Sequence, residues 1–462
     1  MKKPIVSLAV AAGLLVSTAP AAIYAKPLAV QSQVKHPGFD HKVVNNLNVE
    51  NTYNHIRYLS QTPRVAGTPD EENAVRYVKE QFESYGYKTE IQEFTFIGYT
   101  PPSKIELKVA GFDNLKPDSF TYSVNGDING ELVLAGLGTK EELAGKDLTG
   151  KIALIERGSI SFGEKVINAS EAGAAGVIIY NNAEGSLNGT LGEMDKRYVP
   201  VLSLSKAEGE ALAAVVKKGG VTANLKIEGA DAGERTSHNV IATKPATNKN
   251  KAKDGAILMG AHHDSVPGAP GANDDASGTA SVLELARVFK DIPTDTELRF
   301  ITFGAEELGL LGSEHYVSTL TQEEARKIIG YFNMDMVGSK DAGDLSIKTV
   351  DGNPNIVSQL SQASSKRLNG LPTPLEEGGR SDHVPFFEAG IPSASFIHTP
   401  TEPWYHTPED TLDKISKEKL LDVAEIVGTA VYSLAHPDNQ GPKTVKTPKA
   451  AKPQDRHEQN IK

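Results

Sequence analysis

Residues 256–264 of the chain read AILMGAHHD. The run at residues 256–260 is apolar without alternation, which is typical of a strand buried on both faces of a sheet. Other runs of strand length share this character, and helical stretches at 281–289 and 416–434 separate several of them; these runs are residues 239–243, 297–303, 330–336 and 394–398. Buried strands that alternate with helices predict an α/β fold, in which helices sandwich a mostly parallel, doubly wound sheet.

The segment that precedes this rhythm is expected to share the same core. Residues 68–86 have the pattern of a helix, with Pro69 in its first turn, and residues 88–96 alternate like a strand. One helix and one strand cannot close a domain. Residues 27–125 are therefore expected to join residues 229–440.

Residues 126–228 have a different character. Short β-branched runs are separated by glycines, and one helical piece lies at residues 164–171. This pattern predicts a small α/β domain that is inserted into the larger one.

Imidazole and carboxylate side chains follow the predicted strands where each strand ends. Ligands of an open parallel sheet bind beyond the carboxyl ends of its strands, so these side chains are expected to converge. They are His262 and Asp264, then Asp274 and Asp275 before the next helix, Glu306 and Glu307, Asp335, and finally His406.

The 462 residues include no cysteine, which excludes thiol catalysis and any metal site with sulfur ligands. Histidine and carboxylate ligands suit zinc, and two adjacent metals require a bridging carboxylate. A two-metal hydrolase also needs an unligated carboxylate that takes a proton from the attacking water. The candidate ligands are His262, Asp274, Glu307, Asp335 and His406, with Glu306 as the candidate base and Asp264 as a support for His262.

Each feature alone also has a structural explanation. Adjacent glutamates often complement a helix dipole, and an Asp-Asp pair before a helix is usually a cap. Their occurrence in order after successive strands favours a catalytic site.

Five segments closely resemble the secreted di-zinc aminopeptidases, the co-catalytic zinc exopeptidases related to bacterial leucyl aminopeptidase. The segments are HHDS at 262–265, ANDDASG at 272–278, FGAEE at 303–307, NMDM at 333–336 and YH at 405–406. Residues 126–228 resemble the protease-associated (PA) insert found in this family, on the segments GKIALIERG at 150–158 and EAGAAGV at 171–177.

The resemblance implies a role for each candidate residue. Asp274 matches the ligand that bridges two zinc ions. His262 and Asp335 match the other ligands of one zinc, and Glu307 and His406 those of the second. Glu306 matches the general base, and Tyr405 matches a phenol that stabilises the oxyanion.

The implied function is removal of N-terminal residues from peptides and proteins by a zinc-activated water. Relatives accept residues from Leu to Arg and Lys, so the expected substrates carry a free N-terminus with an apolar residue, a basic residue or either. One alternative is a carboxypeptidase or dipeptidase on the same scaffold, in which Arg380 binds a substrate carboxylate instead of pairing with an aspartate to hold a loop. Two others are a single-zinc enzyme like glutaminyl cyclase and a metal-free binding ectodomain like that of the transferrin receptor.

The ends of the chain predict where the protein works. Residues 1–25 begin with lysines, continue with an apolar run too short to span a membrane and end in small residues, which predicts a signal peptide and a secreted, extracellular protein. No later stretch has about 18 uninterrupted apolar residues, so no integral membrane segment is expected after cleavage.

Residues 441–462 carry spaced lysines among prolines and are expected to form a disordered basic tail. A solvated linker and a weak contact with an anionic cell envelope both fit this composition. The net charge of -11 leaves no domain-sized basic face for a nucleic acid.

Overall fold

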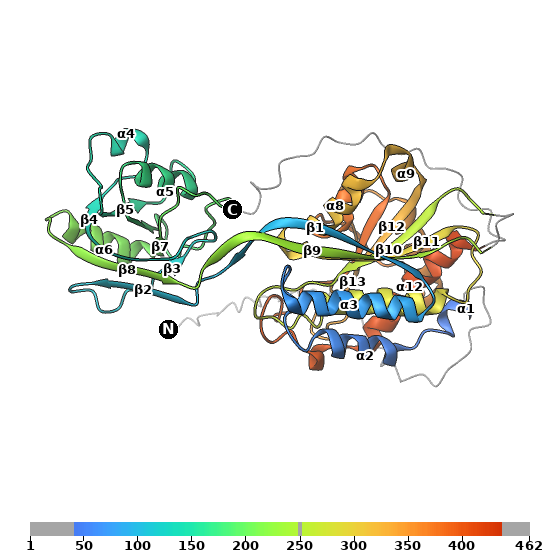
Figure 1. Ribbon diagram of the computed structural model, residues 1–462. Coiled ribbons are helices and arrows are strands. Elements are labelled where there is room, and N and C mark those ends of the chain that lie inside the picture. Colours follow the sequence, from blue (N-terminus) through green and yellow to red (C-terminus); the bar gives the residue numbers. More distant parts are fainter. Residues whose placement is uncertain (1–40, 248–251, 437–462) are drawn as a thin grey trace, which may run out of the picture.

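The computed structural model shows two modules that two long strands connect (Figure 1). The structure describes residues 41–247 and 252–436, so the expected signal peptide and basic tail lie outside the described residues. The larger module contains an eight-stranded sheet with the order β1-β9-β11-β10-β12-β15-β13-β14, and the insert contains a seven-stranded sheet with the order β2-β8-β4-β5-β6-β7-β3.

The strands of the larger module are β1 (Lys88–Thr100), β9 (Asp231–Lys244), β10 (Ala256–His262), β11 (Glu297–Phe303), β12 (Ile328–Met334), β13 (Asp344–Thr349), β14 (Leu375–Glu377) and β15 (Ser393–Thr399). Its helices are α1 (His41–Val44), α2 (Val49–Leu59), α3 (Pro69–Ser84), α7 (Ala276–Phe289), η1 (Glu306–Leu308), α8 (Leu311–Thr319), α9 (Gln322–Lys327), α10 (Ile356–Asn369), α11 (His383–Glu388), η2 (Leu412–Lys414) and α12 (Lys417–Ala435).

The insert contains β2 (Lys104–Val109), β3 (Asp118–Ser119), β4 (Gly126–Leu134), α4 (Lys140–Leu143), β5 (Ile152–Glu156), α5 (Phe162–Glu171), β6 (Gly176–Tyr180), β7 (Val201–Leu204), α6 (Lys206–Val216) and β8 (Thr222–Glu228).

The centre of the larger sheet is parallel, as the apolar runs predict. Strands β11, β10, β12 and β15 are parallel neighbours, and antiparallel pairing occurs only toward the edges, at β1, β9 and β13. Every residue of β10 is buried, which explains why its sequence does not alternate. The predicted α/β fold with a mostly parallel, helix-covered sheet is confirmed.

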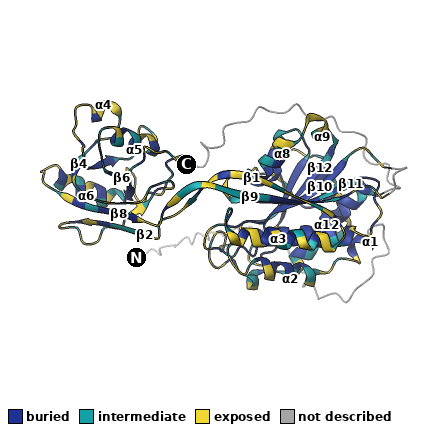
Figure 2. Ribbon diagram, viewed as in Figure 1, coloured by how far each residue is buried: buried dark blue, intermediate teal, exposed yellow. Residues whose placement is uncertain are grey.

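Alternate residues of β10 enter two different cores. Ile257 and Met259 pack in the core beneath α2, α3, α7, α10 and α12, whereas Leu258 packs in the core beneath α8 and α11. In Figure 2 the central strands are dark blue, and α2 and α3 show yellow positions on their outer sides. The sheet therefore has helices on both faces, and the larger module depends on this double burial of apolar area.

The N-terminal segment is part of the larger module. Thr68 caps α3 by accepting a hydrogen bond from the backbone N–H of Glu71, and Pro69 occupies the first turn, where a missing N–H costs nothing. The ring of Phe82 lies 6.4 Å from that of Phe300 on β11. Residues far apart in the sequence thus share one core.

The insert begins earlier than residue 126, the expected boundary. Strands β2 and β3 precede that residue, yet β2 pairs with β8 and β3 pairs with β7. The expected boundary is therefore wrong at its N-terminal side. Its sequence signal is weak because β2 alternates polar and apolar residues, and only its distant partner β8 shows to which sheet it belongs.

The two connecting strands place the insert on one particular edge of the larger sheet. β1 and β9 pair antiparallel from Lys88↔Thr243 to Thr100↔Asp231, but β11 pairs with β9 only as far as Thr302↔Val240. Residues 231–239 therefore project about 30 Å beyond the carboxyl end of β11, at ~3.3 Å per residue. The insert is carried at the edge where the parallel strands end (Figure 1).

Candidate metal centre

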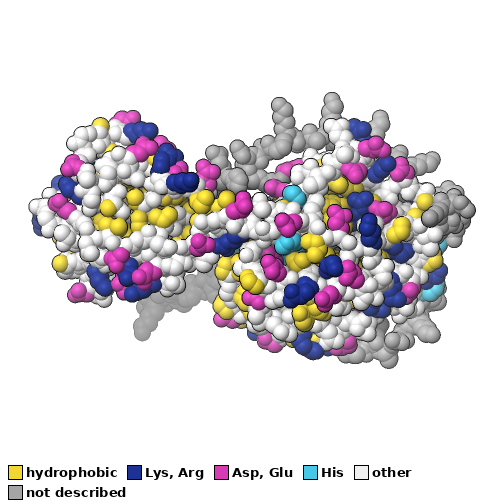
Figure 3. Space-filling view, in the orientation of Figure 1, with side chains coloured by type: hydrophobic (Ala, Val, Ile, Leu, Met, Phe, Trp, Pro, Cys, Tyr) yellow, Lys and Arg dark blue, Asp and Glu magenta, His cyan; other side chains and the backbone are white. Residues whose placement is uncertain are grey.

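The predicted site residues meet at the carboxyl edge of the larger sheet. His262 is the last residue of β10, Asp335 directly follows β12, and Glu306 and Glu307 open the single turn η1 after β11. The loop between β10 and α7 supplies Asp274, and the loop after β15 supplies His406. Figure 3 shows the larger module beside the insert, with acidic and basic side chains spread over the visible face.

Asp274 lies between the two histidines. Its Oδ1 is 3.2 Å from Nε2 of His262, and its Oδ2 is 3.2 Å from Nε2 of His406. A carboxylate whose two oxygens face two different imidazoles has the arrangement that a bridging metal ligand requires.

The remaining ligand candidates divide between the two sides of Asp274. Asp335 Oδ1 lies 3.8 Å from Nε2 of His262, and Glu307 Oε2 lies 3.0 Å from Nε2 of His406. Glu306 also faces His262, at 3.9 Å. Ligand atoms within 4.8 Å of one another form two groups, His262 with Asp274 and Glu307, and His262 with Glu306 and Asp335.

The donor atoms fit a divalent metal such as zinc. Oε1 of Glu307 and Oδ1 of Asp335 are buried and accept no hydrogen bond. Buried carboxylate oxygens without a donor are costly, and a bound cation removes that cost. The nitrogen and oxygen ligands, with no sulfur, match the ligands of catalytic zinc sites.

Asp264 lies beside this centre. Its Oδ1 lies 3.4 Å from Nδ1 of His262, so its charge faces this side of the ring and Nε2 is left for a metal. Its two oxygens also accept hydrogen bonds from the backbone N–H groups of Glu306 and Glu307, at 3.1 and 3.3 Å. One carboxylate thus aligns the end of β10 with the turn after β11.

Asp275 has a larger role than the helix cap expected from its sequence position. It does cap α7, because Oδ1 accepts the N–H of Gly278 at 2.9 Å. Oδ1 also accepts the N–H of Met336 at 3.1 Å, and Oδ2 accepts the N–H of His262 at 3.3 Å. The sequence shows only the cap, because the other two donors come from separate strand ends.

The backbone is strained at three places beside the centre. Ala305, Met336 and His406 have φ values of 54°, 55° and 59°, in the left-handed region that side chains disfavour. Ala305 precedes the candidate base Glu306, Met336 follows the candidate ligand Asp335, and His406 is a candidate ligand itself. Such strain persists only where the surrounding structure fixes the conformation, and it is typical of functional sites.

Mutual proximity shifts the protonation of these groups in the metal-free protein. Burial alone lowers the pKa of His406, but contacts with Asp274 and Glu307 outweigh it and raise that pKa to about 10. The pKa of His262 is also raised, because Glu306, Asp264 and Asp274 outweigh its burial. Burial and the charge of Asp274 raise the pKa of Glu307 to about 7.

Tyr405 lies at the mouth of the centre. Its side chain is 44% exposed, and its ring stacks on that of His406 with 3.7 Å between centroids. Burial of the hydroxyl, followed by the charges of Asp274 and Glu307, raises its pKa above the ordinary value for tyrosine. The phenol therefore stays protonated and can donate a hydrogen bond.

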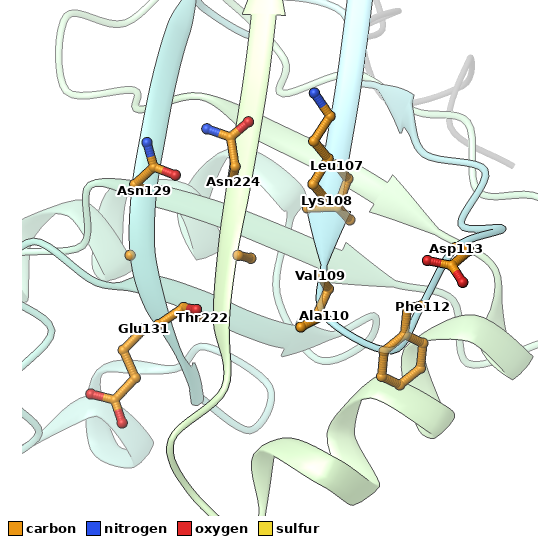
Figure 4. A pocket seen from close by; sticks show the side chains of 12 residues that line it. Leu107, Lys108, Val109, Ala110, Phe112, Asp113, Asn129, Glu131, Thr222 and Asn224 are labelled. Carbon is orange, nitrogen blue, oxygen red and sulfur yellow. The ribbon is translucent and has the colours of Figure 1, made fainter.

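Two other features do not belong to the carboxylate cluster. Arg380 is exposed, and no ion pair joins it to any residue within the described ranges, so the structure does not support an Arg–Asp pair that holds the loop. A hollow of about 710 Å³ lies on the insert. The residues that line it include Lys108 on β2, Asn129 and Glu131 on β4, and Asn224 on β8 (Figure 4). It brings together no histidine and lies on the other module from the carboxylate cluster.

Fold and site together define a metal-dependent hydrolase with an inserted second domain. Residues 239–431 match the family model described as peptidase family M28, and residues 128–212 match the PA domain. Aminopeptidase YwaD of Bacillus subtilis is 39% identical over 420 residues, which cover 88% of this chain and 89% of that protein. The chain therefore belongs to peptidase family M28, and it carries a PA domain as the resemblance implied.

Solved structures agree with this assignment. An aminopeptidase from Aneurinibacillus sp. strain AM-1 is 55% identical, with a TM-score of 0.75 over 88% of this chain and 99% of that one. BSAP, a zinc aminopeptidase from Bacillus subtilis, is 39% identical, with a TM-score of 0.64 over 84% of this chain and 95% of that one. A further sequence relative, Leucine aminopeptidase 2 of Trichophyton rubrum, is 31% identical over 406 residues, which cover 80% of this chain and 80% of that protein.

The raised pKa values predict how metal binding depends on pH. Zinc must displace the protons of His262 and His406, so its apparent affinity is expected to keep rising with pH toward about 10, the pKa of His406, instead of levelling off above the ordinary histidine pKa of ~6.5. Isothermal titration of the metal-free protein between pH 6 and 9, in buffers of different ionisation enthalpy, measures the protons released. An affinity that is constant above pH 7, with no proton release there, would contradict this electrostatic account.

Proposed function

We propose that this M28 peptidase is a two-zinc aminopeptidase that removes residues from the free N-termini of peptides and proteins. The position of Asp274 carries the proposal, because its two oxygens face the imidazoles of His262 and His406. The names of the relatives support it, since they are aminopeptidases and one is described as a zinc enzyme.

The ligands divide into two sets in this proposal. His262 and Asp335 would hold one zinc, Glu307 and His406 would hold the other, and Asp274 would be shared by both. Zinc at this position supplies a lowered pKa for bound water and a positive charge that polarises a carbonyl oxygen.

Glu306 is the proposed general base. It is buried beside His262 but belongs to neither proposed ligand set, so its carboxylate remains available for a proton. It accepts a proton from the attacking water as the C–O bond forms, and it delivers that proton to the leaving amine as the C–N bond breaks. A base positioned in this way contributes typically ~10²–10⁴-fold to the rate.

The polar groups around the base can stabilise the negative charge that develops on the carbonyl oxygen and the positive charge of the substrate's α-ammonium group. The Tyr405 hydroxyl donates a hydrogen bond to the carbonyl oxygen as negative charge develops there. The carboxylates attract the positive α-ammonium group of a free N-terminus, whereas a substrate carboxylate would be repelled unless a cation binds it. This preference favours an aminopeptidase over a carboxypeptidase.

The side-chain preference extends the same proposal. Leucine aminopeptidase 2 of Trichophyton rubrum is named for an apolar residue. We propose that the enzyme removes apolar N-terminal residues such as Leu, and that basic residues such as Arg and Lys are its second class of substrate. Relative kcat/KM values on a panel of aminoacyl anilides test this choice.

Secretion is a further part of the proposal and rests on residues 1–25, outside the described ranges. Every helix within the described ranges is too short or too polar to cross a bilayer. Export with cleavage after Ala25 gives a protein that begins at Lys26. N-terminal sequencing of the protein from a culture medium tests this, and a cell-bound protein that keeps Met1 would contradict it.

Glu306→Gln is expected to abolish turnover without loss of metal. The amide keeps the size and polarity of the side chain but cannot accept the proton, so kcat should fall at least ~10²-fold while two zinc ions remain bound. Metal analysis together with steady-state kinetics measures both quantities. Glu323→Gln is the matched control, because Glu323 is exposed on α9 and should retain parental kcat. A fully active Glu306→Gln enzyme would overturn the assignment.

Acetylation of the substrate N-terminus is expected to stop hydrolysis. It removes the positive charge that the carboxylates attract, while the C-terminus of the peptide is unchanged. Mass spectrometry of a Leu-initiated pentapeptide and its N-acetyl form should show loss of Leu from the first and no cleavage of the second. C-terminal trimming of the acetylated peptide would instead establish a carboxypeptidase.

A further inference from the structure

Arg64 is a buried cation that the proposed mechanism does not use. It is 1% exposed, and four hydrogen bonds join its guanidinium to backbone carbonyl groups. Nε donates to His263 at 2.7 Å, Nη1 to Leu59 at 2.9 Å and to Pro270 at 2.6 Å, and Nη2 to Gly271 at 3.0 Å. The guanidinium therefore ties the residue after His262 to the loop that leads to Asp274.

The approach of Arg64 to this loop is close. Gly271 has a φ of 61°, and a Cβ atom at this position would lie 2.9 Å from Nη2 of Arg64 and 2.3 Å from the carbonyl oxygen of Asp274. Any larger residue would push the guanidinium and the loop apart. Glycine is required here both by the backbone conformation and by this contact.

Asp410 holds the same loop from its other side. Its Oδ1 accepts the N–H of Asn273 at 2.8 Å, and its Oδ2 accepts the N–H of Asp274 at 3.0 Å. Its backbone carbonyl accepts the N–H of Ala272 at 3.2 Å. Asp410 is 1% exposed and lies in the loop that carries His406, so it links Asp274 to the second histidine.

The two side chains have complementary roles. Arg64 binds the carbonyl groups at residues 270 and 271, and Asp410 binds the amide groups of residues 273 and 274. Charge-assisted hydrogen bonds of this kind are short and directional. The charge of Arg64 also offsets those of the surrounding Asp264, Asp274, Asp275 and Asp410.

We propose that Arg64 and Asp410 are positioning residues of the metal centre, with Arg64 holding Asp274 against His262 and Asp410 holding it against His406. This inference rests on the two-zinc site proposed above. Arg64 and Asp410 would contact no metal themselves, but they would set the distance between the His262 side and the His406 side of the centre.

Zinc affinity is the test, because a role in stability alone would leave it unchanged. Arg64→Met removes both the charge and the donors. It is expected to lower the affinity for both zinc ions about 10–100-fold, as loss of groups that orient metal ligands typically does. Arg64→Lys keeps the charge but not the planar fork, so a smaller loss is expected. Asp410→Asn places an amide N–H against a backbone N–H. Because Asp410 holds Asp274 against His406, this change should lower the affinity for the zinc at Glu307 and His406 more than for the zinc at His262 and Asp335.

A matched control separates positioning from stability. Lys165 is a buried cation of the insert that also donates to backbone carbonyl groups, those of Leu137 and Gly158. Lys165→Met should lower the thermal midpoint but keep the parental zinc affinity. Titration of the metal-free proteins with zinc, and the absorption spectra of their cobalt forms, report the metal site independently of activity.

The outcomes distinguish the two proposals. A parent protein that binds fewer than two zinc ions would refute the two-zinc site itself. A parent with two zinc ions, together with a folded Arg64→Met or Asp410→Asn variant of parental affinity and cobalt spectrum, would refute the positioning role of that residue. If Arg64→Met does not fold, Arg64→Lys and Asp410→Asn still decide the question.

Discussion

The buried carboxylate of Asp275 is the constraint on which the centre depends. It accepts the backbone N–H groups of His262, Gly278 and Met336, which belong to the end of β10, the start of α7 and the segment after β12. Hydrogen bonds contribute about 0.5–1.5 kcal/mol each to stability, and a buried donor that loses its acceptor costs about 1–3 kcal/mol. One side chain thus fixes the separation of two strand ends that carry ligands, and its neighbour Asp274 is turned to lie between His262 and His406.

The carboxylate groups clustered at this edge repel one another, and several features of the fold offset this electrostatic repulsion. Asp264, Asp274, Asp275, Glu306, Glu307 and Asp335 lie within a small volume, and like charges at such distances repel strongly in a buried site. Backbone N–H groups, the charge of Arg64 and the protonated histidines compensate in the metal-free protein. Bound zinc would replace the protons, which is why metal binding and protonation are expected to be linked.

The sequence predicts that His262 and Asp335 meet at one edge of the sheet, because their positions follow from the topology of the parallel strands. Parallel strands bring their carboxyl ends to one edge, so any His or carboxylate directly after such a strand, as His262 or Asp335, arrives at the site. Asp275, Arg64 and Asp410 act instead through backbone groups of segments that are distant in sequence, so no local pattern reveals their partners. The start of the insert is hidden for the same reason, because β2 alternates like an ordinary exposed strand and is assigned to its sheet only by β8.

The proposed sharing of Asp274 between two zinc ions can be measured by anomalous diffraction at the zinc absorption edge, on crystals grown with zinc. We expect two peaks, one near His262 and Asp335 and one near Glu307 and His406, each about 2.0–2.2 Å from a different oxygen of Asp274. A single peak, or two peaks of which one does not contact Asp274, would contradict the proposed sharing.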